Sequence, residues 1–193
     1  MVIPYRSLSL LVLGVWLGGS VAVDIAVSQN FQTVDRFLAA PGDSRTSAQL
    51  SAIGRVPERA ILRRNAAEEN NWLFLNWERA ELAIGGMLLV LCRIGQQRQK
   101  MKITGSVALL AIVAAEHFLL TPDIVSLGRI VDGLTAADPR YRTFWILHGF
   151  YSGLDILKMV VIFGIGVRAA FLRPDTGSLR EEAWQRRHQV VAE

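Results

Sequence analysis

The sequence contains one cysteine, Cys92, among its 193 residues. A single cysteine excludes an internal disulfide and a CxxCH site for haem attachment. The motifs GxSxG, GxxxxGK[ST], HExxH and GxGxxG, which are typical of hydrolases, phosphoryl-transfer enzymes, metalloproteases and dinucleotide-binding enzymes, are also missing. We therefore predict a non-enzymatic protein.

Charged residues are scarce in four long apolar segments, 7–27, 72–92, 103–121 and 143–167. Each segment reaches the roughly 20 residues that an α-helix needs to cross about 30 Å of hydrocarbon. Hydrophobic residues make up 51% of the chain and the mean hydropathy is +0.30. We predict an all-α integral membrane protein, a four-helix bundle formed by residues 1–173, in the bacterial inner membrane.

The net charge of +4 is compatible with nucleic-acid binding, but no nucleic-acid-binding motif accompanies it. The basic residues instead lie just beyond the apolar segments: Arg6, Arg93, Arg98, Lys100, Lys102, Arg168 and Arg173. Because short cytoplasmic loops are enriched in Lys and Arg, this distribution predicts that both termini and the 93–102 loop are cytoplasmic. Residues 174–193 then form a cytoplasmic tail, and we expect no nucleic-acid partner.

The first 22 residues also fit a cleaved signal peptide, with a basic start, an apolar centre and the small-x-small site Ser20–Val21–Ala22. The apolar stretch continues past that site through Ile25 and Val27. We therefore expect the segment to remain as the first span.

The outer segment 28–71 is too long for a simple connection. Apolar residues at helical spacing, Phe31, Val34, Phe37 and Leu38, extend the first helix as far as Pro41. Pro57 suits the start of a second helix, which nothing interrupts before Gly85 and would be about 35 residues and 50 Å long. We predict an outward-projecting helical hairpin, and we expect Pro122 to kink or end the third span.

Ionisable residues recur inside the predicted spans: Asp24, Glu78, Arg79, Glu81, Glu116, His117, His148, Asp155 and Lys158. Counting about 1.5 Å per residue places most of them about 14–25 Å from the cytoplasmic boundary, and His148 about 29 Å from it. A charge at the bilayer centre costs at least about 2.5–3.5 kcal/mol, so these side chains should face one another. Five acids against Arg79 and Lys158 leave three excess negative charges, which calls for protonated carboxyl groups or a bound cation.

Four interpretations of this polar cluster remain open. Carboxylate and imidazole groups are ligands for a metal centre, and the candidates are Glu78, Glu81, Glu116, His117 and His148, although the Glu-x-x-His pairs of di-metal bundles are missing. Acids could line a proton or solute path. His117 and His148 could hold haem, despite differing by about 10 Å in depth. The fourth interpretation, a buried hydrogen-bond and salt-bridge network that fixes helix register, is favoured, and no cofactor is predicted.

Three short motifs carry a family resemblance. They are Trp16 followed by Gly18, an Asn-aromatic-Trp-Glu stretch ending at Trp77 and Glu78, and Phe144, His148, Gly149 and Ser152 at the entry to the last span. The chain resembles the transmembrane protein 205-like family of small four-span proteins of unknown function, although Glu81 stands where an amide is expected. The resemblance implies the four-span topology and points to Trp16, Glu78 and His148. It implies no activity.

We predict an accessory or structural subunit of a membrane complex, with the lipid bilayer and either a larger assembly or a second copy as its partners. A small transporter or an ion- or proton-handling protein is the main alternative, and a metal- or haem-binding redox component is the other.

Overall fold

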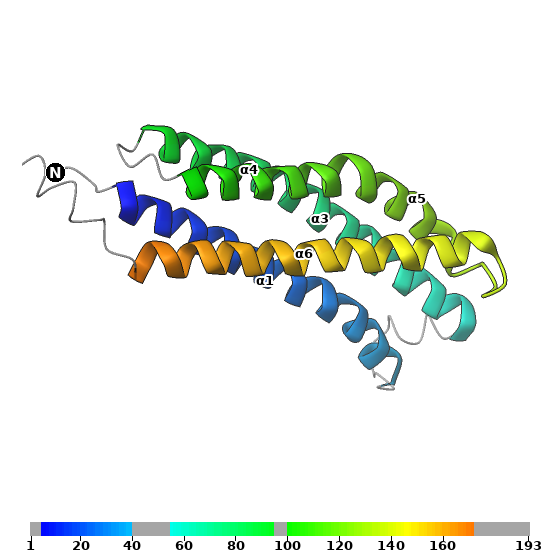
Figure 1. Cartoon of the computed structure of the whole chain (residues 1–193). Helices are drawn as coiled ribbons and strands as arrows, with labels where there is room; N and C mark the ends of the chain where they lie inside the picture. Colours follow the sequence, from blue (N-terminus) through cyan, green and yellow to red (C-terminus); the bar gives the residue numbers. More distant parts are fainter. Residues whose placement is uncertain (1–4, 40–54, 95–99, 172–193) are drawn as a thin grey trace, which may run out of the picture.

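The computed structural model describes residues 5–39, 55–94 and 100–171, and all regular elements in these ranges are helical (Figure 1). The elements are α1 (Tyr5–Ala39), α3 (Arg55–Ile94), α4 (Lys100–Ala115), the π-helical turn η1 (Glu116–Leu120), α5 (Thr121–Val131) and α6 (Pro139–Phe171). The prediction of an all-α fold is confirmed for this part of the chain. The expected stop at Pro41 and the tail 174–193 lie outside the described residues.

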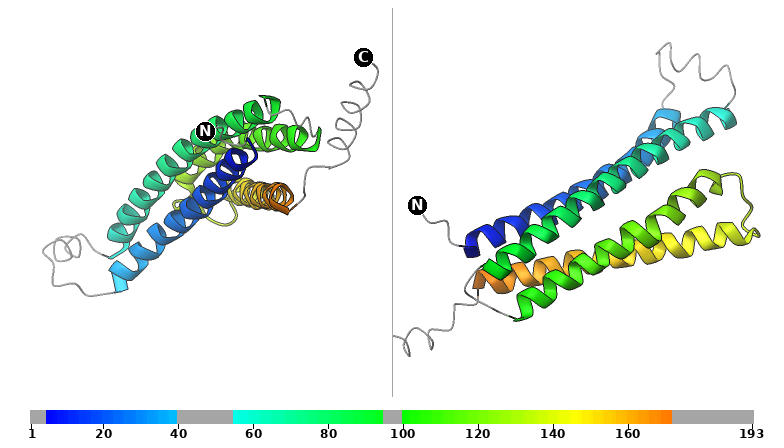
Figure 2. Two further views of the ribbon diagram at one scale, coloured as in Figure 1. Left: turned by 90° about the vertical axis from the view of Figure 1, so that its left-hand side faces the viewer. Right: turned by 90° about the horizontal axis from the view of Figure 1, so that it is seen from above.

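α3 is one uninterrupted helix of 40 residues, about 60 Å long at 1.5 Å per residue. It includes Gly85 and Gly86, and it begins two residues before Pro57, where a proline in the first turn loses no intrahelical hydrogen bond. α1 runs beside it for most of its length, as both views of Figure 2 show, so the two long helices form a packed pair.

The sequence-based expectation is a kink or an end at Pro122, and the third helix does not end there. α4, η1 and α5 follow one another without a break, and Pro122 lies in the first turn of α5. Proline has no backbone N–H and its ring clashes with an ordinary helical turn before it. Here the preceding turn is widened, because the Thr121 backbone N–H bonds to the Glu116 carbonyl five residues earlier. The π-helical turn therefore lets the helix continue through the proline.

The four long helical units form a closed ring. α1 packs on α3 and α6, and the continuous α4–α5 helix also packs on α3 and α6, so α3 and α6 lie diagonally across the bundle. Near the N-terminus of α1 the centre is an apolar core of Val12, Leu13, Trp16, Leu88, Leu109, Val113 and Ile162. Toward the other end, the α1–α3 pair diverges from the α5–α6 pair (Figure 2).

Many hydrophobic side chains are exposed on the outer surface of the bundle, whereas several charged side chains are buried in its interior. Exposed hydrophobic side chains occur on every long helix, for example Leu11, Val90, Leu119 and Phe163, whereas Glu78, Glu81, Glu116 and Lys158 are 0–1% exposed. By length and composition, two helical stretches, Tyr5–Ala39 and Ile103–Val131, are able to cross a membrane, and only 22% of each apolar window is buried. The apolar stretches of α3 and α6 are interrupted by the charged residues that face inward.

Two adjacent glycines of α1 provide a test of this packing. A methyl group on Gly19 would overlap the indole ring of Trp77, whereas one on Gly18 would meet nothing within 4 Å. We expect Gly19→Ala to lower the free energy of unfolding by about 1–3 kcal/mol through overpacking. Gly18→Ala should leave it unchanged or raise it by up to about 1 kcal/mol. Unfolding of the two purified variants in mild detergent measures both effects, and equal stability of the two would contradict the α1–α3 packing.

Candidate functional site

Lys158 of α6 lies at the centre of a buried polar network. Its ammonium group donates to Glu81 Oε2 at 2.8 Å, to Glu116 Oε2 at 3.1 Å and to Asp155 Oδ1 at 2.7 Å. An ammonium group has three N–H donors, so each one finds a carboxylate. The side chain is 1% exposed. α3, η1 and α6 therefore meet at one buried charge.

Glu81 connects this centre to α1. Its Oε1 accepts hydrogen bonds from Trp16 Nε1 at 2.9 Å and from Ser20 Oγ at 3.0 Å. Ser20 Oγ in turn accepts a bond from Trp77 Nε1 at 3.3 Å. Trp16, one of the positions to which the family resemblance points, thus donates its indole N–H to a buried carboxylate. Together with Lys158, these bonds satisfy both oxygens of Glu81.

Glu78, one helical turn before Glu81, is the centre of a second set of bonds. Its Oε1 accepts from Thr121 Oγ1 at 2.5 Å and from Tyr151 OH at 3.0 Å, and its Oε2 lies 2.8 Å from His117 Nδ1. A carboxylate is an acceptor, so the tautomer that satisfies the pair carries its proton on Nδ1. Glu78 is 0% exposed and both of its oxygens are partnered.

Carboxyl groups outnumber cations around Lys158. Asp24 of α1 lies close to the Asp155 carboxyl group, so four acids gather near one ammonium group. Among the described residues, Glu116 Oε1 is the buried side-chain atom that has no hydrogen-bond partner. A buried oxygen with no donor is costly, and so is uncompensated negative charge. The network is therefore electrostatically incomplete at Glu116 and at the Asp24–Asp155 pair.

Seven of the nine polar residues singled out in the sequence lie in or beside this network; Arg79 and His148 do not. Arg79 is exposed on the outer side of α3. His148 is stacked on Phe144, with ring centroids 5.7 Å apart, in the wall of a separate cavity. Residues at the same depth can lie on different faces of a helix. The rotation of α3 about its axis places Arg79 on the outer face, although Glu78 and Glu81 point inward.

The five candidate metal ligands are divided among three places. Glu78 pairs with His117, Glu81 and Glu116 bind the Lys158 ammonium group, and His148 lines the cavity. Within the described ranges, no three His, Cys, Asp or Glu side chains are grouped as metal ligands. This distribution gives the metal hypothesis and the bis-histidine haem hypothesis no support.

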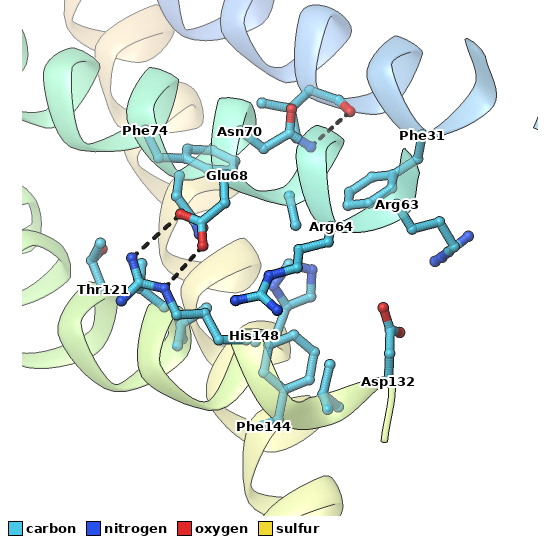
Figure 3. Close-up of a pocket in the computed structure, with 18 of the residues that line it drawn as sticks. Phe31, Arg63, Arg64, Glu68, Asn70, Phe74, Thr121, Asp132, Phe144 and His148 are labelled. Carbon is cyan, nitrogen blue, oxygen red and sulfur yellow. Dashed lines mark hydrogen bonds and ion pairs between the residues drawn. The ribbon is translucent and has the colours of Figure 1, made fainter. Parts of the chain in front are cut away.

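A cavity of about 560 Å³ opens on the side of the network away from the apolar core (Figure 3). Residues of α1, α3, α5 and α6 line it, and Tyr151 and Thr121 belong both to its lining and to the bonds of Glu78. Glu68 of α3 binds Arg129 of α5 at its edge, with contacts of 3.0 and 3.3 Å. Hydrogen bonding to the Arg129 guanidinium holds the pKa of the Glu68 carboxyl group below its ordinary value.

Several residues of the network were missed in the sequence because they are not ionisable at ordinary pH. Trp16, Ser20 and Asp24 follow one another at intervals of four on α1, and Tyr151, Asp155 and Lys158 share a face of α6 at intervals of four and three. Residues at these spacings lie on the same side of a helix. Ser20 and Tyr151 could therefore have been predicted from their spacing, because each lies four residues before an acid that the sequence already singled out, Asp24 and Asp155.

Comparison with known proteins found no matching family model, no matching curated protein and no matching solved structure. The network and the cavity must therefore be interpreted from their own chemistry.

Removing the central cation should be strongly destabilising. We expect Lys158→Met to lower the free energy of unfolding by about 3–5 kcal/mol, because Glu81 and Glu116 then remain as buried carboxylates without their counter-charge. The double variant Lys158→Met/Glu116→Gln should recover part of this loss, since it removes one of those charges. Leu157→Met, at the exposed neighbouring position, is the matched control. Unfolding by SDS, followed by tryptophan fluorescence, measures all three, and a Lys158→Met variant as stable as the original would contradict the assigned contacts.

Proposed function

We propose that the protein is a four-span membrane protein, with both termini on the cytoplasmic side, whose buried network binds and exchanges protons. The four-span arrangement is supported by the apolar side chains exposed on all long helices and by the burial of the charged ones. The ends rich in basic residues also meet: Arg6, at the start of α1, donates hydrogen bonds to the carbonyls of Ala169 and Ala170, at the end of α6.

The observation that carries the proton assignment is the buried Glu116 Oε1, which has no donor, together with the crowding of Asp24 and Asp155 near the Lys158 ammonium group. Two ionised carboxylates are both acceptors and repel each other, so neighbouring carboxyl groups such as those of Asp24 and Asp155 favour a shared proton. Glu116, which has one oxygen on Lys158 and one without a donor, is a second place for a proton. Proton uptake would relieve the excess negative charge without bringing another ion into the bundle.

The residues of the network differ in how exposed their side chains are. This difference favours exchange of protons with the surroundings over a proton that is held permanently. Glu81, Glu116 and Lys158 are 0–1% exposed, whereas the Asp155 side chain is 14% exposed and Asp24 is half-buried. Asp155 and Glu116 both bind the Lys158 ammonium group, so a proton arriving at Asp155 is two contacts away from Glu116. Glu78, whose oxygens are both partnered, serves mainly to position Tyr151 and His117.

Proton flux through liposomes tests this proposal. The protein is reconstituted with a trapped pH-sensitive dye, and a potassium gradient with valinomycin supplies the driving voltage. We expect dye acidification above that of empty liposomes, and at least a tenfold loss of rate in Asp24→Asn and in Glu116→Gln, because each variant removes a titrating group. Glu69→Gln, which changes an exposed acid of α3, is the control for charge and should keep the full rate.

The same variants distinguish proton exchange from a purely structural network. If Asp24→Asn and Glu116→Gln lower the midpoint of thermal unfolding but the original protein carries no protons, the network only fixes helix register. If both variants fold and keep the full rate, the proton assignment is wrong.

Arg79 supports a second candidate function, as a subunit of a membrane assembly. It is exposed on the apolar part of α3, and no hydrogen bond or ion pair of its guanidinium is found in the part of the chain that the structure describes. Ala83 and Gly86 follow it on the same side of the helix, and space beside Gly86 is open within 4 Å. Small residues allow another helix to approach closely, and a partner helix that carries a carboxylate would satisfy the guanidinium.

The mass of the purified protein in mild detergent tests this assembly. We expect a protein mass well above the 21.4 kDa of one chain, measured by light scattering after gel filtration, and a shift to a single chain in Arg79→Leu. Arg142→Leu, at an exposed position of α6, should keep the larger mass. A single-chain mass for the original protein would exclude a stable assembly.

A further inference from the structure

The cavity has the size and the composition of a ligand site. Its volume of about 560 Å³ is within the range of roughly 300–1,000 Å³ that is usual for small-molecule pockets. It lies where the α1–α3 pair separates from the α5–α6 pair, so four chain segments contribute to its wall (Figure 2). The apolar part of that wall includes Phe31, Phe74, Phe144 and Trp145.

The charged residues of the wall leave one cation in excess. Three guanidinium groups, from Arg63, Arg64 and Arg129, face two carboxylates, from Glu68 and Asp132. Arg129 is held by Glu68 in a two-bond ion pair, and Arg63 lies over the ring of Phe31, 5.3 Å from its centroid. Among the described contacts Arg64 donates no hydrogen bond, although its charge acts on the nearby Glu68 carboxyl group. Arg63 and Arg64 therefore both have free donors, and because Arg63 lies on the ring of Phe31, Arg64 is the candidate anion site.

Arg64 extends into the space that His148 and Phe144 border from α6 (Figure 3). A guanidinium binds carboxylate and phosphate oxygens through two parallel N–H donors. His148 and the aromatic rings line the same cavity and offer an imidazole and an apolar surface. At the bottom, Tyr151 packs its ring edge-on against Phe74, 5.6 Å away, and its hydroxyl is already used by Glu78. The cavity therefore offers a ligand one anion-binding group, Arg64, and mainly apolar contacts with the aromatic rings.

We propose that this cavity binds an amphipathic molecule with a single negative charge, a carboxylate or a phosphate, which pairs with Arg64 while its apolar part lies against Phe74, Phe144 and Trp145. The assignment uses residues outside the Lys158 network and does not depend on proton exchange. Both a fatty acid and an anionic phospholipid have this chemistry.

Quenching of tryptophan fluorescence by brominated lipids is a direct test, since Trp145 lies in the cavity wall. The full-length protein is placed in phosphatidylcholine nanodiscs, and three probes are compared: 9,10-dibromostearate, dibrominated phosphatidylglycerol and dibrominated phosphatidylcholine. We expect saturable quenching by at least one anionic probe, with an apparent affinity about tenfold above that of the zwitterionic one. Preference for the stearate alone identifies a free carboxylate, and preference for phosphatidylglycerol alone identifies a lipid headgroup.

A matched pair of arginine variants and three further substitutions locate the binding. Arg64→Gln should remove the tenfold preference, whereas Arg59→Gln, which changes the net charge equally but pairs with Asp35 outside the cavity wall, should retain it. Val125→Phe should weaken binding of every probe by filling space without altering charge. Trp145→Phe should lose the saturable part of the signal, and Glu116→Gln should keep it. Equal effects of Arg64→Gln and Arg59→Gln, or no preference for either anionic probe, would overturn the proposal.

Discussion

The ammonium group of Lys158 sets the main constraint on this structure. It is buried among Glu81, Glu116 and Asp155, which come from three separate helical segments. Because a buried charge is tolerated only with its counter-charges in place, the three segments must keep a common register. Glu81 extends this requirement to α1 through Trp16 and Ser20. α3 and α6, which lie diagonally across the ring, are thereby joined through its centre.

The π-helical turn is a consequence of the same constraint. Glu116 must face Lys158, while Thr121 must face Glu78. In a regular α-helix, residues five apart point about 140° away from each other. The widened turn between them brings both side chains toward the interior and also accommodates Pro122. One local distortion therefore serves both halves of the network and carries the helix onward to form the cavity wall.

Along its axis the bundle changes from an apolar core, through the polar network, to the cavity. Each of these layers is in contact with the next. The core around Trp16 separates the network from the ends where Arg6 and Arg168 lie. The cavity is connected to the network by Tyr151, whose ring contacts Phe74 and whose hydroxyl binds Glu78. A molecule bound against Tyr151 would thus be one hydrogen bond away from a buried carboxylate, which offers a physical route for coupling ligand binding to the network.

Much of this arrangement follows from the sequence, since a helix rises by a constant distance per residue. Counting from the basic ends placed Glu78, Glu81, Glu116 and Lys158 in one layer, and the missing helix breakers predicted the length of α3. Rotation about each helix axis was decided only by packing. It buried Glu78 and Glu81 while leaving Arg79 outside, and it sent His148 into the cavity. The division of the acids into two sets of bonds likewise required the tertiary structure, because which oxygen meets which donor depends on how four helices approach one another.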